Sequence, residues 1–255
     1  MLLWAPIAVS AQTTEPSWGL FYTTGVESNS VFTSNAEVPR PIASVTKLMT
    51  AWLAISADQS LSRVVSITPQ DTQNASTTIL RVRDRVSVRD LIYLMLVSSD
   101  NVAARAIARV VGGSREQFVR SMNHEAERLM MTHTEYSDPS GLLSTNISTV
   151  HDLVRLITVI MSSPILADAF HTPIYTATVT RNRRVRSITV KNTNRLLTNT
   201  TQISKTGFTT AAGYCLVQLI TDQHDSYITI ILGAPSKDYR QGVTEALMKI
   251  AGIEH

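Results

Sequence analysis

The chain has 255 residues but only one cysteine, Cys215, and this scarcity removes two kinds of structure. A single thiol cannot form an internal disulfide, and it cannot supply a zinc site that needs several cysteines. The six histidines show no metal-ligand spacing such as H-x-x-x-H, so we expect no metal and no cofactor. Because Cys215 lies in an apolar, strand-like segment, we expect it to be a small buried hydrophobic residue.

Charge is also sparse, since 17% of the residues are charged and the formal net charge is +3. The positive residues are dispersed except in residues 181–186 (RNRRVR). A protein that binds nucleic acid usually carries more concentrated positive charge, so we expect no nucleic-acid partner. We interpret the basic segment as the solvated turn of a hairpin rather than as a site for a polyanion.

Long apolar runs are missing too, and no segment is predicted to be a transmembrane helix. Residues 1–11 are apolar and end in Val9-Ser10-Ala11, a small-residue pattern that resembles the end of an export signal cut before Gln12. The basic start of such a signal is absent, so residues 1–11 are either a signal peptide remnant, the interpretation we favour, or a short apolar N-terminus. A signal remnant would indicate an exported protein, for which the expected location is the periplasm or cell envelope.

The remaining composition, with 44% hydrophobic residues, is typical of a globular protein with a sizeable core. Alternating, strand-like segments lie near both ends of the chain, at 18–24, 30–33, 202–209, 213–221 and 227–233. Helical periodicity dominates the middle, where Ser87, Ser114 and Ser148 are predicted helix caps, and a last helix covers about 237–250. A separate hairpin is predicted over residues 174–190.

These elements predict an α+β fold. Both chain ends form a five-stranded antiparallel sheet flanked by helices, and an all-helical lobe is inserted between them. We expect residues 12–255 to be a single domain, with an α/β lobe at about 12–68 and 140–255 and a helical lobe at about 69–139. The cleft between the lobes is the natural place for a site.

The segment Ser44-Val45-Thr46-Lys47 can carry chemistry. A helix that begins at Ser44 places a hydroxyl and an amine three residues apart on one face, with free N–H groups at its start that favour an oxyanion. A serine hydroxyl needs a neighbour to take its proton, and Lys47 can do so if burial or nearby positive charge lowers its pKa. Taken alone, the pattern is more often an N-cap followed by a solvated lysine.

Two further segments have an ordinary and a functional interpretation. Ser99-Asp100-Asn101 lies at a break between two apolar helices, where it can cap the second helix or direct short polar side chains into a cleft. Lys205-Thr206-Gly207 lies in an extended run, where a glycine marks either a bulge or the close approach of a ligand or another backbone.

Together the three segments resemble S-x-x-K, S-x-N and K-T-G, the motifs of the serine penicillin-recognising enzymes. The chain is similar to the low-molecular-mass penicillin-binding proteins of the D-alanyl-D-alanine carboxypeptidase family over about residues 18–252, and most similar to the D-alanyl-D-alanine endopeptidase branch. The matching stretches are 43–51 (ASVTKLMTA), 138–142 (DPSGL), 192–197 (NTNRLL) and 204–216 (SKTGFTTAAGYCL). The resemblance implies a β-lactamase/transpeptidase-like fold and a serine DD-peptidase that attacks D-alanyl bonds of peptidoglycan peptides through an acyl-enzyme.

The resemblance also implies roles for individual residues. Ser44 would be the acylated nucleophile and Lys47 its base. Ser99 and Asn101 would hold the proton network and a substrate amide, and Lys205 would add positive charge near Lys47, which disfavours a second charge there.

Substrate binding is implied mainly for the third motif. Lys205 and Thr206 would receive the terminal carboxylate of the substrate, and the backbone N–H groups of Ser44 and Phe208 would form the oxyanion hole. The predicted substrate-binding residues are Thr206, Gly207, Phe208 and Thr209.

Asp100 departs from the pattern, because S-D-N is common in class A β-lactamases. Those enzymes also need a glutamate in an E-x-x-L-N pattern, and none lies between Asn101 and Lys205. A class A-like β-lactamase is therefore the less favoured alternative. A non-catalytic penicillin sensor domain is another, but such domains are normally tethered to a transmembrane segment, and none is predicted here.

The expected partners are peptidoglycan peptides that end in D-Ala or are cross-linked through it, with β-lactams as covalent inhibitors. Family carboxypeptidases usually carry a β-rich second domain and an amphipathic anchor, whereas this sequence stops at His255, just after the last predicted helix. We therefore expect the enzyme to cleave cross-links at least as readily as it trims a terminal D-alanine.

Overall fold

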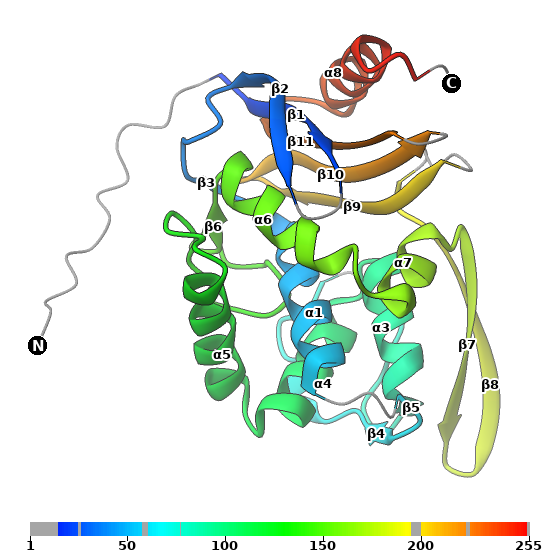
Figure 1. The fold of residues 1–255 in the computed structure, drawn as a ribbon. Helices are drawn as coiled ribbons and strands as arrows, with labels where there is room; N and C mark the ends of the chain where they lie inside the picture. Colours follow the sequence, from blue (N-terminus) through cyan, green and yellow to red (C-terminus); the bar gives the residue numbers. More distant parts are fainter. Residues whose placement is uncertain are drawn as a thin grey trace, which may run out of the picture.

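The computed structural model describes residues 15–24, 27–57, 61–76, 78–194, 200–222 and 225–253. The predicted signal remnant, and residues 195–197 of the 192–197 stretch, lie outside these ranges. Figure 1 shows a sheet that combines strands from both chain ends, with helices on its two faces.

The main sheet is antiparallel, has five strands and follows the order β2-β1-β11-β10-β9. The α+β fold with a five-stranded sheet built from both chain ends is confirmed. Cys215 is fully buried on β10, as expected. The strands are β1 (Ser17–Thr23), β2 (Ser28–Ser34), β9 (Thr201–Thr209), β10 (Gly213–Asp222) and β11 (Asp225–Ala234).

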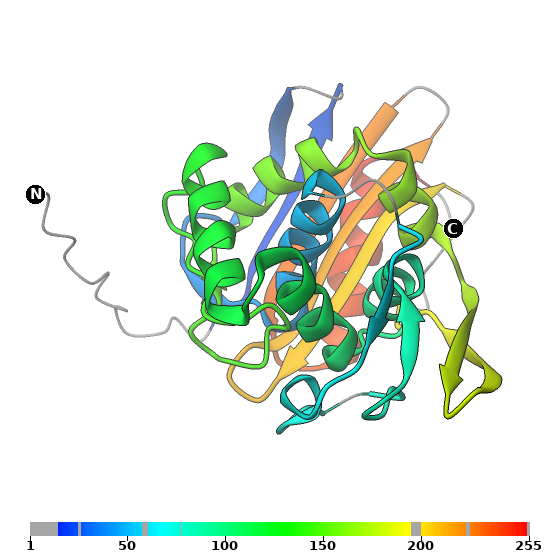
Figure 2. The same cartoon turned by 90° about the horizontal axis from the view of Figure 1, so that it is seen from below.

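Helices cover both faces of this sheet (Figures 1 and 2). The C-terminal helix α8 (Lys237–Ile250) packs on β10 and β11, and α6 (Val150–Ile160) packs on β1 and β11 from the other side. The α1 helix (Lys47–Ala57) contacts α6 and also the helices of the middle of the chain. These are α3 (Val88–Val97), α4 (Asn101–Gly112) and α5 (Arg115–Arg128).

Capping residues set several of these helix starts. The hydroxyls of Ser87 and Ser114 accept backbone N–H groups at the starts of α3 and α5, as the sequence predicts. The prediction for Ser148 is wrong by one residue, because Thr149 caps α6 and accepts the N–H of Asp152 at 3.1 Å. Ser148 instead belongs to the short strand β6 (Ile147–Ser148), which pairs with β3 (Arg40–Pro41).

A second sheet has the order β4-β5-β7-β8. Its strands are β4 (Val64–Ser66), β5 (Arg85–Ser87), β7 (Ile174–Arg181) and β8 (Arg184–Lys191). The predicted hairpin is confirmed as β7 and β8, but its arginine-rich end is not simply a solvated turn. Arg181 and Arg186 lie 3.6 Å and 2.6 Å from the buried carboxylate of Asp84, a partner that no local sequence pattern reveals.

The α1 helix and the β7–β8 hairpin, both placed in the α/β lobe by the sequence, contact α3 of the middle segment. The lobe boundaries stay a prediction. Among the described helices, none alone is long and apolar enough to cross a membrane, and α6 passes such a test only together with α7 (Pro164–His171), at a bend of 113°. The helix α7 and the short helix α2 (Pro69–Thr72) were not predicted from the sequence.

Candidate active site

Ser44 and Lys47 lie where the chain enters α1. Residues Ala43–Thr46 form a single 3-10 turn, η1, and the α-helix proper begins at Lys47, three residues later than predicted. Side chains at positions i and i+3 of a 3-10 turn lie almost above one another. The expected pairing is therefore kept, and Lys47 Nζ lies 2.8 Å from Ser44 Oγ.

Three oxygen atoms surround the amine of Lys47, whose side chain is fully buried. They are Ser44 Oγ at 2.8 Å, Asn101 Oδ1 at 2.7 Å and the Ser140 carbonyl oxygen at 2.6 Å. The Asn101 and Ser140 oxygens can only accept hydrogen bonds, so they use both N–H groups of a neutral amine. The lone pair then faces the Ser44 hydroxyl, which is the arrangement that a base needs to take its proton.

The surroundings of Lys47 favour the neutral amine. Burial lowers the pKa of Lys47 well below its usual value, and the positive charge of Lys205 lowers it further. The carboxylates of Asp138 and Asp100 act in the opposite direction but do not reverse the shift. Burial and the second lysine therefore lower the pKa together, as the sequence analysis requires for a lysine base.

Asn101 is the first residue of α4, and its amide is held in one orientation. Its Nδ2 donates to the Ser76 carbonyl oxygen at 2.5 Å, which directs Oδ1 toward Lys47. The start of α4 thus brings the second motif into contact with the first.

Asp100, the residue that departs from the family pattern, has a structural role in this protein. Its carboxylate accepts the N–H of Ala103 at 2.8 Å, capping α4, and the N–H of Ile79 at 2.9 Å. The capping interpretation of this residue is confirmed. The carboxylate also fastens the segment around Ile79 to the start of the helix that carries Asn101.

Ser99 lies between α3 and α4 and is 8% exposed. Its backbone has φ of 62°, a left-handed conformation that is uncommon for a serine. Within the described part of the chain, no hydrogen bond links Ser99 to Ser44, Lys47 or Lys205. Its part in a proton network remains a proposal.

Ser140 is a site residue that was not predicted from the sequence, because residues 138–141 were predicted only as a turn. The carboxylate of Asp138 organises this loop, accepting the backbone N–H groups of Ser140, Gly141 and Leu143 at 2.6–2.9 Å and the Asn146 side-chain amide at 2.7 Å. Burial alone would raise the pKa of Asp138, but the hydrogen bond from the Ser140 hydroxyl, followed by those from the backbone N–H groups and Asn146, holds it below its usual value. The DPSGL stretch was the available signal.

Gly141 explains how this loop reaches the nucleophile. Its φ is +79°, and a Cβ there would lie 1.9 Å from the carbonyl oxygen of Ala43. Only glycine allows that approach. The Thr50 hydroxyl of α1 also donates to the Pro139 carbonyl oxygen at 2.7 Å, so two residues of α1, Lys47 and Thr50, hold the loop.

Lys205, Thr206 and Gly207 lie on β9, an edge strand of the main sheet. Lys205 is 1% exposed, and burial, followed by the positive charge of Arg240, lowers its pKa to about 7. Its Nζ donates to the Thr206 carbonyl oxygen at 2.9 Å, and the Thr206 hydroxyl donates to that of Thr193 at 2.8 Å. The charge of Lys205 acts on Lys47, so the first and third motifs meet electrostatically.

Phe208 and Thr209 complete the predicted substrate-binding set on β9. Phe208 is 55% exposed, and its ring lies 4.4 Å from that of Tyr214, centroid to centroid. The Thr209 hydroxyl accepts the Ala212 N–H at 3.1 Å and so stabilises the turn into β10. Direct substrate contact by either residue remains a proposal.

Gly207 allows β9 to approach the nucleophile turn. A Cβ at this position would lie 3.0 Å from the backbone nitrogen of Ser44 and 3.1 Å from the carbonyl oxygen of Ile42. The strand therefore lies directly beside the N–H group that was predicted to bind an oxyanion, and of the two interpretations of this glycine, the close approach of another backbone is the correct one.

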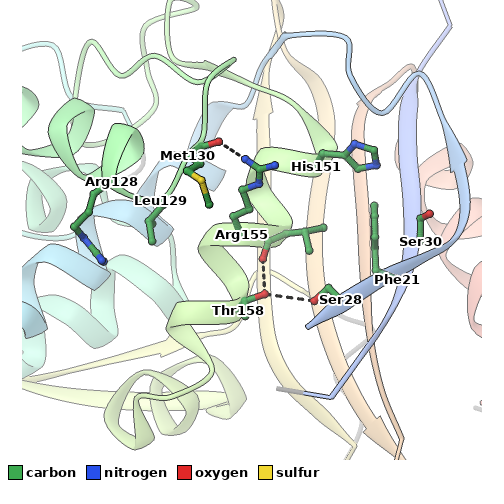
Figure 3. Close-up of a pocket in the computed structure, with 10 residues that line it drawn as sticks. Phe21, Ser28, Ser30, Arg128, Leu129, Met130, His151, Arg155 and Thr158 are labelled. Carbon is green, nitrogen blue, oxygen red and sulfur yellow. Dashed lines mark hydrogen bonds between the residues drawn. The ribbon is translucent and has the colours of Figure 1, made fainter. Parts of the chain in front are cut away.

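A groove of about 520 Å³ lies away from these residues (Figure 3). Its lining comes from β1, β2, α6 and the end of α5, and it contains none of the predicted site residues. Across the described ranges, no cluster of three or more His, Cys, Asp or Glu side chains could hold a metal ion.

The geometry defines a penicillin-recognising serine enzyme fold, and the comparisons identify the family. The sequence profile of the D-alanyl-D-alanine carboxypeptidases matches residues 22–236. The chain belongs to this family, as the three motifs predicted.

Individual relatives agree with this assignment. A D-alanyl-D-alanine endopeptidase of Pseudomonas aeruginosa is 36% identical over 212 residues, covering 81% of this chain and 68% of the relative. The Escherichia coli D-alanyl-D-alanine endopeptidase is 31% identical over 214 residues, with the same coverage. The crystal structure of the Streptomyces K15 DD-transpeptidase superposes with a TM-score of 0.84 at 28% identity, covering 94% of this chain and 98% of that one.

The contact at Gly207 predicts the effect of adding one methyl group. Gly207→Ala should lower the free energy of unfolding by about 1–3 kcal/mol, because the methyl group meets backbone atoms that cannot rotate away. Urea unfolding measures this loss. Gly242→Ala is the matched control, since its Cβ would meet nothing within 4 Å, and alanine is favourable in a helix. Equal stability of the two variants would contradict the close approach of β9 to η1.

The pKa of Lys205 predicts how stability depends on pH. The unfolded chain keeps this lysine protonated up to its ordinary pKa of 10.5, whereas the folded protein releases the proton near pH 7. The unfolded state therefore binds more protons above pH 7, and the free energy of unfolding should gain up to about 1.4 kcal/mol per pH unit from this group. Between pH 7 and pH 9, the slope for Lys205→Met should be lower by about that amount. Identical slopes for the two proteins would show that Lys205 has an ordinary pKa.

Proposed function

We propose that this protein hydrolyses D-alanyl bonds of peptidoglycan peptides through an acyl-enzyme on Ser44. The observation that carries the proposal is the buried Lys47 amine, which lies 2.8 Å from the Ser44 hydroxyl while its other two contacts are acceptors only. The names of the relatives, D-alanyl-D-alanine endopeptidase and carboxypeptidase, supply the substrate class.

The reaction would begin with attack of Ser44 Oγ on the carbonyl carbon of the D-alanyl bond, as its proton passes to Lys47 Nζ. The N–H groups of Ser44 and Phe208 would stabilise the oxyanion of the tetrahedral intermediate. The C–N bond then breaks, and the leaving amine takes the proton through the network of Lys47, Ser99 and Asn101. Water attacks the resulting ester, Lys47 takes the proton of the water, and Ser44 recovers its own.

The strand β9 supports the proposed substrate orientation. An edge strand offers unpaired backbone groups on its free side, where an extended peptide can bind. A substrate carboxylate at Lys205 and Thr206 would favour the protonated form of Lys205, whose pKa of about 7 leaves both forms accessible near neutrality. Binding of a free C-terminus should therefore weaken above pH 7.

Loss of the nucleophile tests the acyl-enzyme. Ser44→Ala should abolish covalent labelling by a fluorescent penicillin, because among the described residues the Ser44 hydroxyl is the one hydrogen-bonded to the Lys47 amine. The variant should stay folded, since the Ser44 side chain does not cap the turn and its loss removes about one hydrogen bond, or ~1 kcal/mol. Thermal melting serves as the control. Labelling that persists at another serine would refute the site.

The finer specificity belongs to the same proposal. We infer a preference for cross-linked peptides, supported by endopeptidase relatives of Pseudomonas aeruginosa, Escherichia coli and Haemophilus influenzae that are 31–36% identical to this chain. Export to the periplasm or cell envelope, and inhibition by β-lactams, also remain proposals that rest on the signal-like residues 1–11 and on the family motifs.

A comparison of two substrates tests this preference. The enzyme should cleave a cross-linked dimeric muropeptide at least as fast as it removes D-alanine from a monomeric pentapeptide, with products identified by mass spectrometry. Ser44→Ala gives the background rate for both. Consumption of the pentapeptide alone would replace the endopeptidase by a carboxypeptidase and leave the roles of Ser44 and Lys47 unchanged.

A further inference from the structure

Two arginine-rich segments that are far apart in sequence lie side by side in the second sheet. Arg85 of β5 pairs with Thr180 of β7, and Arg186 of β8 reaches Asp84, 102 residues away in the chain. The β5 and β7–β8 ends lie together in Figure 1, at the end of the molecule opposite α8.

Asp84 holds this arrangement together from the inside. Its side chain is fully buried and forms ion pairs with Arg181 and Arg186. It also accepts the backbone N–H of Arg81 at 2.9 Å, which closes the turn before β5. The single acid of the two segments, Asp84, is therefore already paired with Arg181 and Arg186, and the other arginines of these segments have no second acid beside them in sequence.

We call these other residues the basic corner, defined as Arg81, Arg83, Arg85, Arg183 and Arg184. All five are exposed, and none takes part in an ion pair within the described residues. Segments 81–87 and 180–186 contain seven arginines and one acid, whereas the formal net charge of the whole chain is +3. The positive charge of the protein is thus concentrated at this corner, and the rest of the chain is net negative.

Backbone conformation gives a second, independent observation. Arg83 and Arg183 have φ of 71° and 64°, left-handed positions where glycine or asparagine is more stable. Arginine at these turns carries a conformational cost of about 1 kcal/mol each. Both turns thus have an arginine at a position where glycine or asparagine would be more stable. The retained positive charge indicates a function for it.

We propose that the basic corner is a secondary binding site for the polymeric form of the substrate, peptidoglycan with free carboxylates on its peptides. This inference rests on the proposed function. Guanidinium groups bind carboxylates through paired hydrogen bonds, and five of them in one place suit a ligand that repeats its charge. A polymer that touches the corner and the β9 edge at once gains from effective concentration, and a short soluble fragment does not.

The surface fits such a polymer better than it fits a lipid bilayer. Proteins that lie on membranes place Trp, Phe or Leu beside their cations. Segments 81–87 and 180–186 contain no aromatic residue or leucine, and the large apolar side chain they expose is Val185, 69% accessible.

The test measures binding to purified insoluble peptidoglycan by sedimentation, in the Ser44→Ala background so that the polymer stays intact. The variant combines Arg81→Gln, Arg85→Gln and Arg184→Gln. A matched control removes the same charge elsewhere, at exposed positions of α5 and α8, with Arg115→Gln, Arg120→Gln and Lys249→Gln. Thermal melting confirms that each protein is folded.

The corner variant should bind roughly tenfold more weakly, because it loses three exposed ion pairs with the carboxylates of the polymer. The control should bind like the parent protein. Binding of the parent should fall steeply between about 0.1 M and about 1 M salt. With Ser44 restored, the corner variant should digest the polymer more slowly but cleave a soluble cross-linked dimer at the parent rate.

Three results would overturn the proposal: equal binding by the corner variant and the parent, equal losses in the corner variant and the control, or tighter binding to anionic phospholipid vesicles than to peptidoglycan. A failure of the proposed function looks different. Peptidoglycan binding that depends on the corner, without cleavage of any peptide by the Ser44 protein, would remove the peptidase and leave the docking site.

Discussion

The desolvated amine of Lys47 is the interaction on which the rest of the site depends. Its three oxygen partners come from separate parts of the chain: the η1 turn, the start of α4 and the loop that follows α5. Each of these segments has its own fastening, by the glycine contact at Gly207, the cap at Asp100 and the carboxylate of Asp138. A loss of register in any one of them would let water reach the amine and restore its ordinary pKa.

Two buried lysines in one site are unfavourable for folding, but their mutual repulsion lowers the pKa of Lys47. The charge of Lys205 disfavours a second charge on Lys47, so the residue that we propose to bind the carboxylate would also help to prepare the proposed base. The buried carboxylates of Asp138 and Asp100 oppose this effect, because their negative charges favour a protonated Lys47. Both carboxylates accept hydrogen bonds from backbone N–H groups, and these bonds hold the neighbouring loops in place. The site sacrifices stability for a neutral amine at its centre, as active sites commonly do.

Local patterns in the sequence predicted the sheet, the caps at Ser87 and Ser114, and the pairing of Ser44 with Lys47, because capping and periodicity act over a few residues. The three motifs also predicted that Asn101 and Lys205 lie in the same site as Ser44 and Lys47. The sequence did not reveal Ser140, because it contacts Lys47 through its backbone carbonyl. The hydrogen bonds of the loop to Asp138 place that carbonyl beside the Lys47 amine. The sequence also hid the contact of Asp84 with Arg181 and Arg186, which joins segments that no repeat or motif connects.

Lys47 must be neutral at the pH where the enzyme works if it is to take the proton of Ser44. The chain has five lysines, so their side-chain carbons can be resolved by NMR after isotope labelling and followed through a pH titration. Two lysines should titrate far below 10.5; the signal of one should disappear in Lys47→Met, and the other should titrate near pH 7. If all five lysines titrated near 10.5, Lys47 would be charged, and a charged amine cannot take the proton of Ser44.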